Sequence, residues 1–279
     1  MSEWFRRGEP VAGIGLDDRG LLYGDGLFET IAVRDGTPRL LDLHLARLAD
    51  GCGRLGIEMP AANILERDIE RALALCTADW RACTLKLVIT AGEGPRGYRR
   101  APGTRPESLV GVFPSASLPD YEQGVAVMTC RTRASIQPDL AGLKTLARLD
   151  QVLARREWDT AGTWEGLMFD ADEQLTCGTM TNVFLVNGNT ISTPLLDRSG
   201  VAGIMRRHLM TLLGAQSIEC REERLRSDDL SAADEVFLCN SQVGAVPVRS
   251  IDERTLEPGE ATRSVMALLG YNGVPECLP

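Results

Sequence analysis

The sequence predicts a mixed α/β fold of two domains, a smaller N-terminal α+β domain and a larger C-terminal domain. The chain has 279 residues, which is long for one compact core and short for three domains. Strand-like and helix-like patterns alternate along it without an internal repeat. Residues 114–124, PSASLPDYEQG, have the composition of a linker. We therefore expect domains at 1–117 and 125–279, joined by residues 118–124.

In the N-terminal half, residues 27–33 (LFETIAV) predict a strand that turns at Asp35-Gly36, because glycine tolerates a positive φ. Residues 40–57 predict a helix, since their apolar side chains recur every three or four positions. The expected buried stripe, with His44 and Arg47 beside it, consists of Leu41, Leu45, Leu48, Cys52 and Leu55. A second helix is expected at 63–76, and further strands at 83–90 and 108–113.

A loop rich in Gly, Pro and Arg, residues 91–106, separates those last two strands. Loops of this length within a compact domain are usually functional or disordered, and we expect function here. The C-terminal half predicts strands at 125–131, 165–169 and 235–239, helices at 145–158 and 203–213, and a hairpin at 183–193 that turns at Asn187-Gly188.

The composition excludes several classes of protein. A formal net charge of -9 and a pI near 4.9 argue against nucleic-acid binding, which needs broad basic surfaces. No apolar run is long enough for a signal peptide or a membrane span, so we expect a cytoplasmic protein. The eight cysteines form no CxxC pair and only two histidines accompany them, so no metal site is expected.

Lysine chemistry has two candidates, because Lys86 and Lys144 are the only lysines among the 30 basic residues. Lys144 lies directly before the expected 145–158 helix, where the helix dipole and desolvation would lower its pKa and give the neutral amine that Schiff-base formation needs. The side chains expected to face inward from that helix region are Leu146, Leu149, Val152 and Leu153. Lys86 is expected on a strand face with its charge in solvent.

Seven short motifs give these residues a common context. They occur in the order GDGLFET (24–30), HLARL (44–48), RGY (96–98), LKTLARLDQVLAR around Lys144, LTCGTMTNVFLV (175–186), GVAGIMR (200–206) and CNSQVGAVPV (239–248). In this order and at this spacing they resemble the class-IV aminotransferases, which include branched-chain and D-amino-acid aminotransferases and aminodeoxychorismate lyases. The resemblance implies a fold-type-IV architecture like that of D-amino-acid aminotransferase, with a C-terminal pseudo-barrel, and a homodimer.

The resemblance also implies pyridoxal 5'-phosphate as the cofactor, held covalently by Lys144. It places Arg47 at the cofactor phosphate, which suits the forked donors of a guanidinium. A second phosphate contact is expected from the helix start at Gly203, Ile204 and Met205, where backbone N–H groups are unpaired. Asn240 and Ser241 are also expected at the cofactor.

Within the family, the CNSQVGAVPV segment and the RGY loop resemble those of the lyases more than those of the branched-chain enzymes. The expected reaction is elimination of pyruvate from 4-amino-4-deoxychorismate to give 4-aminobenzoate for folate synthesis. Arg96 and Tyr98 are expected to bind the substrate, and Thr30 to line the active site. An aminotransferase of the same fold, or a relative of low activity, are the alternatives.

One position departs from the family pattern. Thirty-three residues after the lysine, most members carry a glutamate that hydrogen-bonds the protonated ring nitrogen of the cofactor, and here Cys177 stands there. Cys177 could be a thiolate paired with that nitrogen, or a neutral thiol beside an unprotonated one. The second is expected, because the sequence indicates no cation or helix N-terminus beside the thiol.

Overall fold

The computed structural model describes residues 3–75, 82–159 and 162–278, and the chain divides into two compact units. Unit 1 comprises residues 1–116 together with Lys144–Ala147, and unit 2 comprises 117–143 and 148–279. The short segment that carries Lys144 therefore belongs to the N-terminal unit, although the residues on both sides of it belong to the C-terminal unit.

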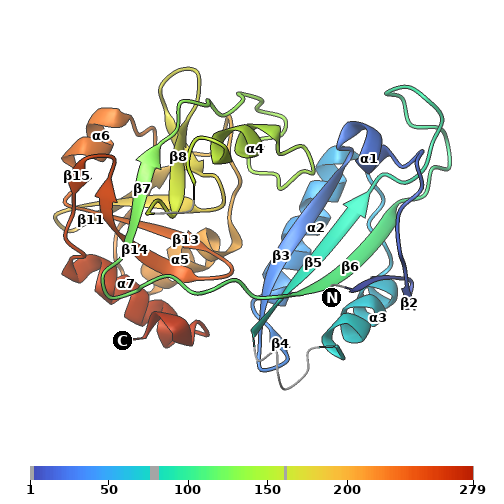
Figure 1. The fold of residues 1–279 in the computed structure, drawn as a ribbon, viewed down its shortest axis with the longest axis horizontal. Coiled ribbons are helices and arrows are strands. Elements are labelled where there is room, and N and C mark those ends of the chain that lie inside the picture. The colour runs from blue at the N-terminus through green and yellow to red at the C-terminus, as the bar shows by residue number, and fades with distance from the viewer. Residues whose placement is uncertain (1–2, 76–81, 160–161, 279) are drawn as a thin grey trace. The chain divides into compact units, whose positions relative to one another are not determined.

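Unit 1 is built on a six-stranded antiparallel sheet with the order β2-β1-β6-β5-β3-β4 (Figure 1). Its strands are β1 (Glu3–Arg6), β2 (Glu9–Pro10), β3 (Gly26–Arg34), β4 (Thr37–Pro38), β5 (Ala82–Thr90) and β6 (Glu107–Pro114). The strands predicted at 27–33, 83–90 and 108–113 are confirmed. The turn after β3 is also confirmed, since Asp35 and Gly36 both have positive φ, 47° and 75°.

Three helices complete unit 1: α1 (Arg19–Tyr23), α2 (Leu41–Leu55) and α3 (Ala62–Leu73). The helix predicted at 40–57 is confirmed, but its buried stripe is rotated from the expected one. His44 is fully buried in that stripe, beside Leu48 and Cys52, whereas Leu45 is only half-buried. The second helix is confirmed at α3, and the predicted end at Cys76 lies outside the described residues.

Unit 2 contains a nine-stranded mixed sheet with the order β12-β11-β10-β13-β14-β7-β8-β9, and β15 pairs with β14. Its strands are β7 (Val125–Thr129), β8 (Glu165–Phe169), β9 (Leu175–Gly178), β10 (Asn182–Asn187), β11 (Thr190–Pro194), β12 (Cys220–Glu223), β13 (Glu235–Asn240), β14 (Gly244–Ile251) and β15 (Arg254–Thr255). Although β9 ends the order, it contacts β10 and β11 near the other end. The sheet thus curls on itself, and the predicted pseudo-barrel is confirmed.

The helices of unit 2 are α4 (Leu149–Arg155), α5 (Ile204–Ala215), α6 (Ser227–Ala232) and α7 (Glu260–Gly270), followed by a 3-10 turn at Pro275–Cys277. Helices α5 and α7 pack against β13 of the sheet, as Figure 1 shows. The core beneath them includes the stacked rings of Phe184 and Phe237, whose centroids are 4.8 Å apart. Across the described ranges, no helix combines the length and the apolar character that crossing a membrane would require.

The helix predicted at 145–158 is wrong at its start, because α4 begins at Leu149. The backbone groups that would open the helix are used elsewhere: Phe28 N–H donates to the Lys144 carbonyl at 3.0 Å, and Leu146 N–H donates to the Gly26 carbonyl at 2.9 Å. Residues 144–146 therefore extend the pairing of β3. No dipole of a helix starting at residue 145 acts on Lys144.

The inward orientation expected for the α4 side chains is also wrong. Leu149, Val152 and Leu153 are 74%, 54% and 50% exposed, and Leu146 is half-buried. The helix is amphipathic as predicted, but its apolar face is not covered by this chain.

The hairpin predicted at 183–193 exists as β10 and β11, with its turn one residue later than expected. Asn187 pairs with Thr190, so the turn centres on Gly188-Asn189. Only Gly188 of these two has a positive φ, 55°, which contradicts the predicted type I′ turn.

Candidate active site

The amine of Lys144 lies over an aromatic ring of β3. Its Nζ is 4.4 Å from the centroid of the Phe28 ring, and its carbonyl accepts from the Phe28 backbone N–H. Thr145 forms a bridge with Leu27 on the same strand. These backbone hydrogen bonds fix the start of the Lys144 side chain against the edge of β3.

The second lysine lies on the same ring. Lys86 Nζ is 5.1 Å from the Phe28 centroid, and Lys86 pairs directly with Thr30 across β5 and β3. Directly opposite residues in an antiparallel pair share a face of the sheet, as Thr30 shares one with Phe28 by alternation. The expected solvated lysine is thus half-buried, and Thr30 lies beside it.

The other face of β3 carries a buried carboxylate that the sequence did not single out. Glu29 is 1% exposed and accepts hydrogen bonds from His44 Nδ1 and, through both of its oxygens, from Arg47 of α2. The Nε of Arg47 is 2.7 Å from Glu29 Oε1. Burial acts to raise the pKa of Glu29, but hydrogen bonds from His44 and Arg47 outweigh burial and leave this pKa lowered.

His44 is neutral in this cluster. Burial lowers the pKa of His44 by more than the bond to Glu29 raises it. A neutral ring that donates from Nδ1 leaves Arg47 as the charged partner of Glu29. Glu29 therefore fixes the direction of the Arg47 guanidinium, which is the group predicted at the cofactor phosphate.

In unit 2, helix α5 begins without a side-chain cap, at Gly203. A Cβ atom at this position would lie 2.0 Å from Asn182 Oδ1, so only glycine fits. Asn182 donates through Nδ2 to the Val201 carbonyl at 2.9 Å and fixes the approach to the helix. The N–H groups at the start of α5, near Ile204 and Met205, have no side-chain cap, and the phosphate contact expected from them stays a prediction.

Two backbone hydrogen bonds of Gly142 connect the segment before Lys144 to the turn before α5. Its N–H donates to the Gly200 carbonyl at 3.0 Å, and its carbonyl accepts from Ala202 N–H at 3.0 Å. Gly142, which is bonded to the turn before α5, is thus only two residues before Lys144 in the sequence.

Cys177 is buried in β9, opposite Met168 of β8. It lies beside the turn before α5, because a Cβ at Gly200 would be 3.9 Å from Cys177 Sγ. Cys177 also interacts electrostatically with Arg148: burial lowers the pKa of Arg148, and Cys177 opposes that shift. The expectation that no cation lies near Cys177 is therefore wrong, and a thiolate there would have a counter-ion.

The neighbouring carboxylate of Glu165 does not replace the missing glutamate. Glu165 is fully buried, and its two oxygens accept from Gly166 N–H, Thr179 N–H and Oγ1, Met180 N–H and Thr181 Oγ1, at 2.6 to 3.1 Å. Burial raises the pKa of Glu165, and the hydrogen bonds from Thr179 Oγ1, Met180 N–H, Gly166 N–H and Thr181 Oγ1 act in the opposite direction. Its function is to hold the loop between β9 and β10.

Asn240 and Ser241 lie in the turn between β13 and β14. Asn240 Oδ1 accepts from the N–H groups of Gln242 and Val243, at 2.8 and 3.0 Å, and its Nδ2 donates to the Met180 carbonyl at 3.4 Å. Asn240 thus shapes this turn and joins it to the loop held by Glu165.

The RGY loop of unit 1 is fixed by its backbone and by the edge-to-face contact of the Tyr98 ring with Tyr23, whose centroids are 5.6 Å apart. The guanidinium of Arg19 donates to the carbonyls of Gly97 and Tyr98 at 2.8 and 2.7 Å, and the Tyr23 hydroxyl accepts from Gly97 N–H at 3.1 Å. Arg96 is exposed and Tyr98 is 89% exposed. A surface hollow of about 540 Å³ lies here, lined by Arg19, Tyr23, Asp25, Tyr98 and Arg100.

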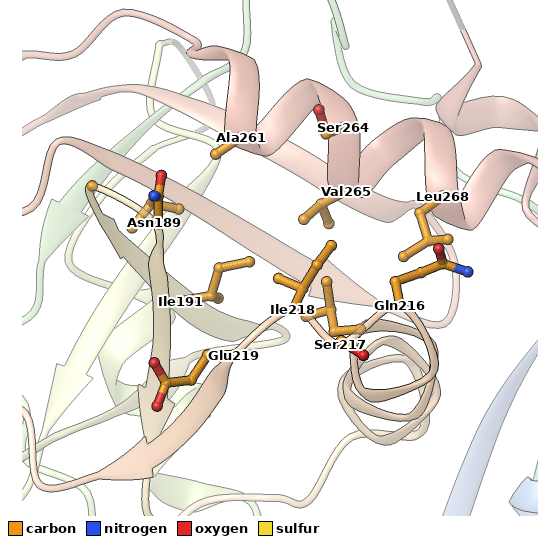
Figure 2. Close-up of a pocket in the computed structure, with 13 residues that line it drawn as sticks. Asn189, Ile191, Gln216, Ser217, Ile218, Glu219, Ala261, Ser264, Val265 and Leu268 are labelled. Carbon is orange, nitrogen blue, oxygen red and sulfur yellow. The ribbon is translucent and has the colours of Figure 1, made fainter.

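A second pocket, of about 760 Å³, contains none of the predicted site residues (Figure 2). It lies in unit 2 between the β10–β11 hairpin, the end of α5 and α7. Ile191, Ile218 and Val265 point into it, and Asn189, Gln216 and Glu219 lie at its margin (Figure 2). Its lining carries no candidate for lysine chemistry.

Sequence reasoning missed Phe28, Glu29 and Asn182. Each lies inside a motif that was recognised, but the sequence offered no partner for it. Glu29 left one signal, a charged residue on the alternate face of an apolar strand, which indicates a buried ion pair.

The residues fit pyridoxal phosphate at two of its three polar ends. A lysine amine suits the aldehyde, while the Arg47 guanidinium and the uncapped start of α5 are each, taken separately, groups that suit a phosphate. Asn182 Oδ1 occupies the space that a Cβ of residue 203 would need, so glycine at the start of α5 lets Asn182 pack there. At the ring nitrogen, Cys177 does not match the usual carboxylate.

Comparison with known proteins agrees with this geometry. The family model "Amino-transferase class IV" matches residues 26–251. An aminodeoxychorismate lyase of Vibrio harveyi is 33% identical over 246 residues, 88% of this chain and 89% of that protein. The crystal structure of 4-amino-4-deoxychorismate lyase from Pseudomonas aeruginosa has a TM-score of 0.90 and 43% identity, over 96% of this chain and 98% of that one. A D-alanine aminotransferase of Bacillus licheniformis is 28% identical over 92% of this chain and 90% of its own.

Proposed function

From the premise that the chain belongs to the class-IV aminotransferase family, we propose that it is a pyridoxal-phosphate-dependent 4-amino-4-deoxychorismate lyase. Its reaction eliminates pyruvate and gives 4-aminobenzoate, a precursor for folate. One observation carries this choice within the family: the likeness to the Pseudomonas aeruginosa lyase extends over nearly the full length of both chains at 43% identity.

We assign residues of this chain to both the aldehyde and the phosphate of the cofactor. Lys144 is the covalent attachment, oriented by the backbone bonds to β3. Arg47 binds the phosphate, with Glu29 holding its guanidinium in place. In unit 2, the amides at Gly203, Ile204 and Met205 are the proposed phosphate ligands, and Asn240 and Ser241, at the β13–β14 turn, are proposed at the cofactor as well.

Pyridoxal phosphate, when bound, supplies an aldehyde that condenses with amines and a ring that accepts electrons. Lys144 would hold the aldehyde of the resting cofactor, and its amine would serve as the base that removes the proton from the amine-bearing carbon of the substrate. The enolpyruvyl group leaves as pyruvate while the carbocycle becomes aromatic. Arg96, Tyr98 and Thr30 orient the substrate.

The direct test supplies the purified, cofactor-loaded protein with chorismate, ammonia and an aminodeoxychorismate synthase, and measures 4-aminobenzoate and pyruvate. We expect both in equal amounts. A parallel reaction with D- or L-amino acids and 2-oxoglutarate tests the aminotransferase alternative. Glutamate formation without 4-aminobenzoate would contradict the proposed function, and no product in either reaction would favour a relative of low activity.

Cys177 is proposed to lie at the ring nitrogen of the cofactor. Replacing Cys177 with glutamate should raise any side transamination about tenfold, equal to about 1.4 kcal/mol of barrier, because a carboxylate keeps the ring nitrogen protonated and strengthens the electron sink. Alanine and 2-oxoglutarate provide the assay, and Cys177→Ser is the control that should not raise the rate. If Cys177→Glu changes neither the cofactor spectrum nor the rate, Cys177 lies elsewhere.

The apolar face of α4 supports a homodimer. Leu149, Val152 and Leu153 lie side by side on one helical face and are each at least half exposed, which is costly for a monomer.

We expect Leu149→Glu combined with Val152→Glu to convert the dimer to monomers in sedimentation velocity, because two charges would be buried unpaired in the interface. Tyr271→Glu, at a residue that is 80% exposed on α7's C-terminal side, is the matched control and should remain dimeric. An unchanged dimer in the α4 variant would place the interface on another surface.

A further inference from the structure

Lys86 occupies a position that is unfavourable for a lysine with only a structural role. Strand β5 is central in the sheet of unit 1, with β6 on one side and β3 on the other. The neighbours Leu85 and Leu87 are fully buried, and Lys86 itself is half-buried. Lysine is disfavoured in central strands, and its desolvated charge needs a partner. Within the described residues, no carboxylate lies in ion-pair distance of Lys86.

The surroundings of Lys86 indicate what that partner is. The sheet face that carries Lys86 also carries Phe28 and Thr30. The amines of Lys86 and Lys144 both lie over the Phe28 ring, at 5.1 and 4.4 Å, so the two nitrogens are less than about 10 Å apart. A ligand attached at Lys144 therefore has a second cation within reach, and an aromatic ring lies beside both amines.

We propose that Lys86 binds the ring carboxylate of the substrate while Lys144 acts at its amine. This inference rests on the proposed function, because 4-amino-4-deoxychorismate carries its amine and its ring carboxylate at opposite ends of one six-membered ring. That separation is compatible with two amines that lie less than about 10 Å apart beside one aromatic ring. A carboxylate beside Lys86 would pair with a charge for which the described residues supply no counter-ion. Lys86 is thus a specificity-determining residue.

The proximity of the two amines also allows a different role for Lys86, in which it activates Lys144, and this role can be tested. A cation near Lys144 disfavours the protonated form of its amine, which is a known way to activate a lysine nucleophile. If that were the function of Lys86, its removal would lower kcat at neutral pH and move the acid limb of the kcat profile to higher pH. A carboxylate-binding residue instead changes KM and leaves that limb in place.

The test compares Lys86→Met with Lys86→Arg in the cofactor-loaded enzyme. We expect Lys86→Met to raise KM for aminodeoxychorismate by about 10- to 100-fold, the range for a hydrogen bond to a charged group, with kcat within about threefold. Lys86→Arg should restore most of the loss, since it keeps the cation. Arg6→Met removes a cation from β1 of the same sheet, 37% exposed and 3.7 Å from Glu107, and should leave KM unchanged.

A binding measurement separates this inference from the proposed function. Chorismate carries the same ring carboxylate but no amine, so it cannot condense with the cofactor, and its Kd is measured by calorimetry. We expect Lys86→Met to weaken chorismate binding about tenfold or more, with Lys86→Gln as a second variant if the first folds poorly. Unchanged KM and chorismate Kd would overturn the inference, as would a kcat loss with a shifted acid limb. A wild-type enzyme that makes no 4-aminobenzoate yet binds chorismate through Lys86 would overturn only the proposed function.

Discussion

Replacing Lys144 with alanine is expected to lower the rate of 4-aminobenzoate formation by about 10³-fold or more, because one amine both holds the cofactor and moves the substrate proton. The cofactor should then bind only through its phosphate and ring, so dialysis should remove it. The measurement is the single-turnover rate together with the visible spectrum of the bound cofactor.

Lys144→Arg is the matched variant, since it keeps the charge over Phe28 but cannot form the covalent bond. It should be as inactive as Lys144→Ala while unfolding at the same temperature as the wild type. Retention of more than about a tenth of the activity in either variant would contradict the assignment of the base to Lys144.

The second large effect is expected at the buried ion pair between Arg47 and Glu29. Arg47→Met should lower the free energy of unfolding by about 3–5 kcal/mol, because it leaves the Glu29 carboxylate buried without its charged partner. The double variant Glu29→Gln with Arg47→Met should recover much of this loss, since no uncompensated charge remains. Urea unfolding of the three proteins measures both quantities.

The affinity for pyridoxal phosphate distinguishes the role of Arg47 from that of Glu29. Arg47→Met and the double variant should both bind pyridoxal phosphate weakly, whereas Glu29→Gln alone should keep most of the affinity and lose the orientation of Arg47. If the double variant were as unstable as Arg47→Met, the ion pair would not be the source of the loss.

The same cluster predicts how stability depends on acid. The lowered pKa of His44 means that the unfolded chain takes up a proton first, so stability falls as the pH drops below about 6.5. The lowered pKa of Glu29 adds a further loss below about 4.5, which continues until the folded carboxyl is protonated. In the Glu29→Gln variant this second phase should be reduced to the part that comes from other carboxyls whose pKa values are also lowered, among them Asp25 and Glu157.

The sequence was most informative where its patterns are local. The central strands β3, β5 and β6 and the β10–β11 hairpin were predicted from the pattern of apolar residues, and the turn at Asp35-Gly36 followed from residues that tolerate positive φ. Lys144 could be selected from a set of two lysines, and the motif order supplied the family.

The sequence misled where a distant strand decides the local structure. Residues 145–148 have helical spacing, but the backbone of Lys144 bonds to Phe28 and that of Leu146 to Gly26 of β3, so α4 starts later. We expect a surface outside this chain to cover the exposed apolar stripe of α4. Amphipathicity alone cannot distinguish such a stripe from one that faces the core of its own chain. Arg148 near Cys177 and Lys86 near Lys144 are likewise neighbours only in the fold.

The measurement that bears most directly on the function is the location of the covalent cofactor. With only two lysines and the N-terminal amine available, borohydride reduction of the cofactor-loaded protein followed by peptide mapping has an unambiguous result. The label is predicted on the peptide that contains Lys144 and absent from the peptide that contains Lys86. A label on Lys86, or on the N-terminus alone, would contradict the role given to Lys144.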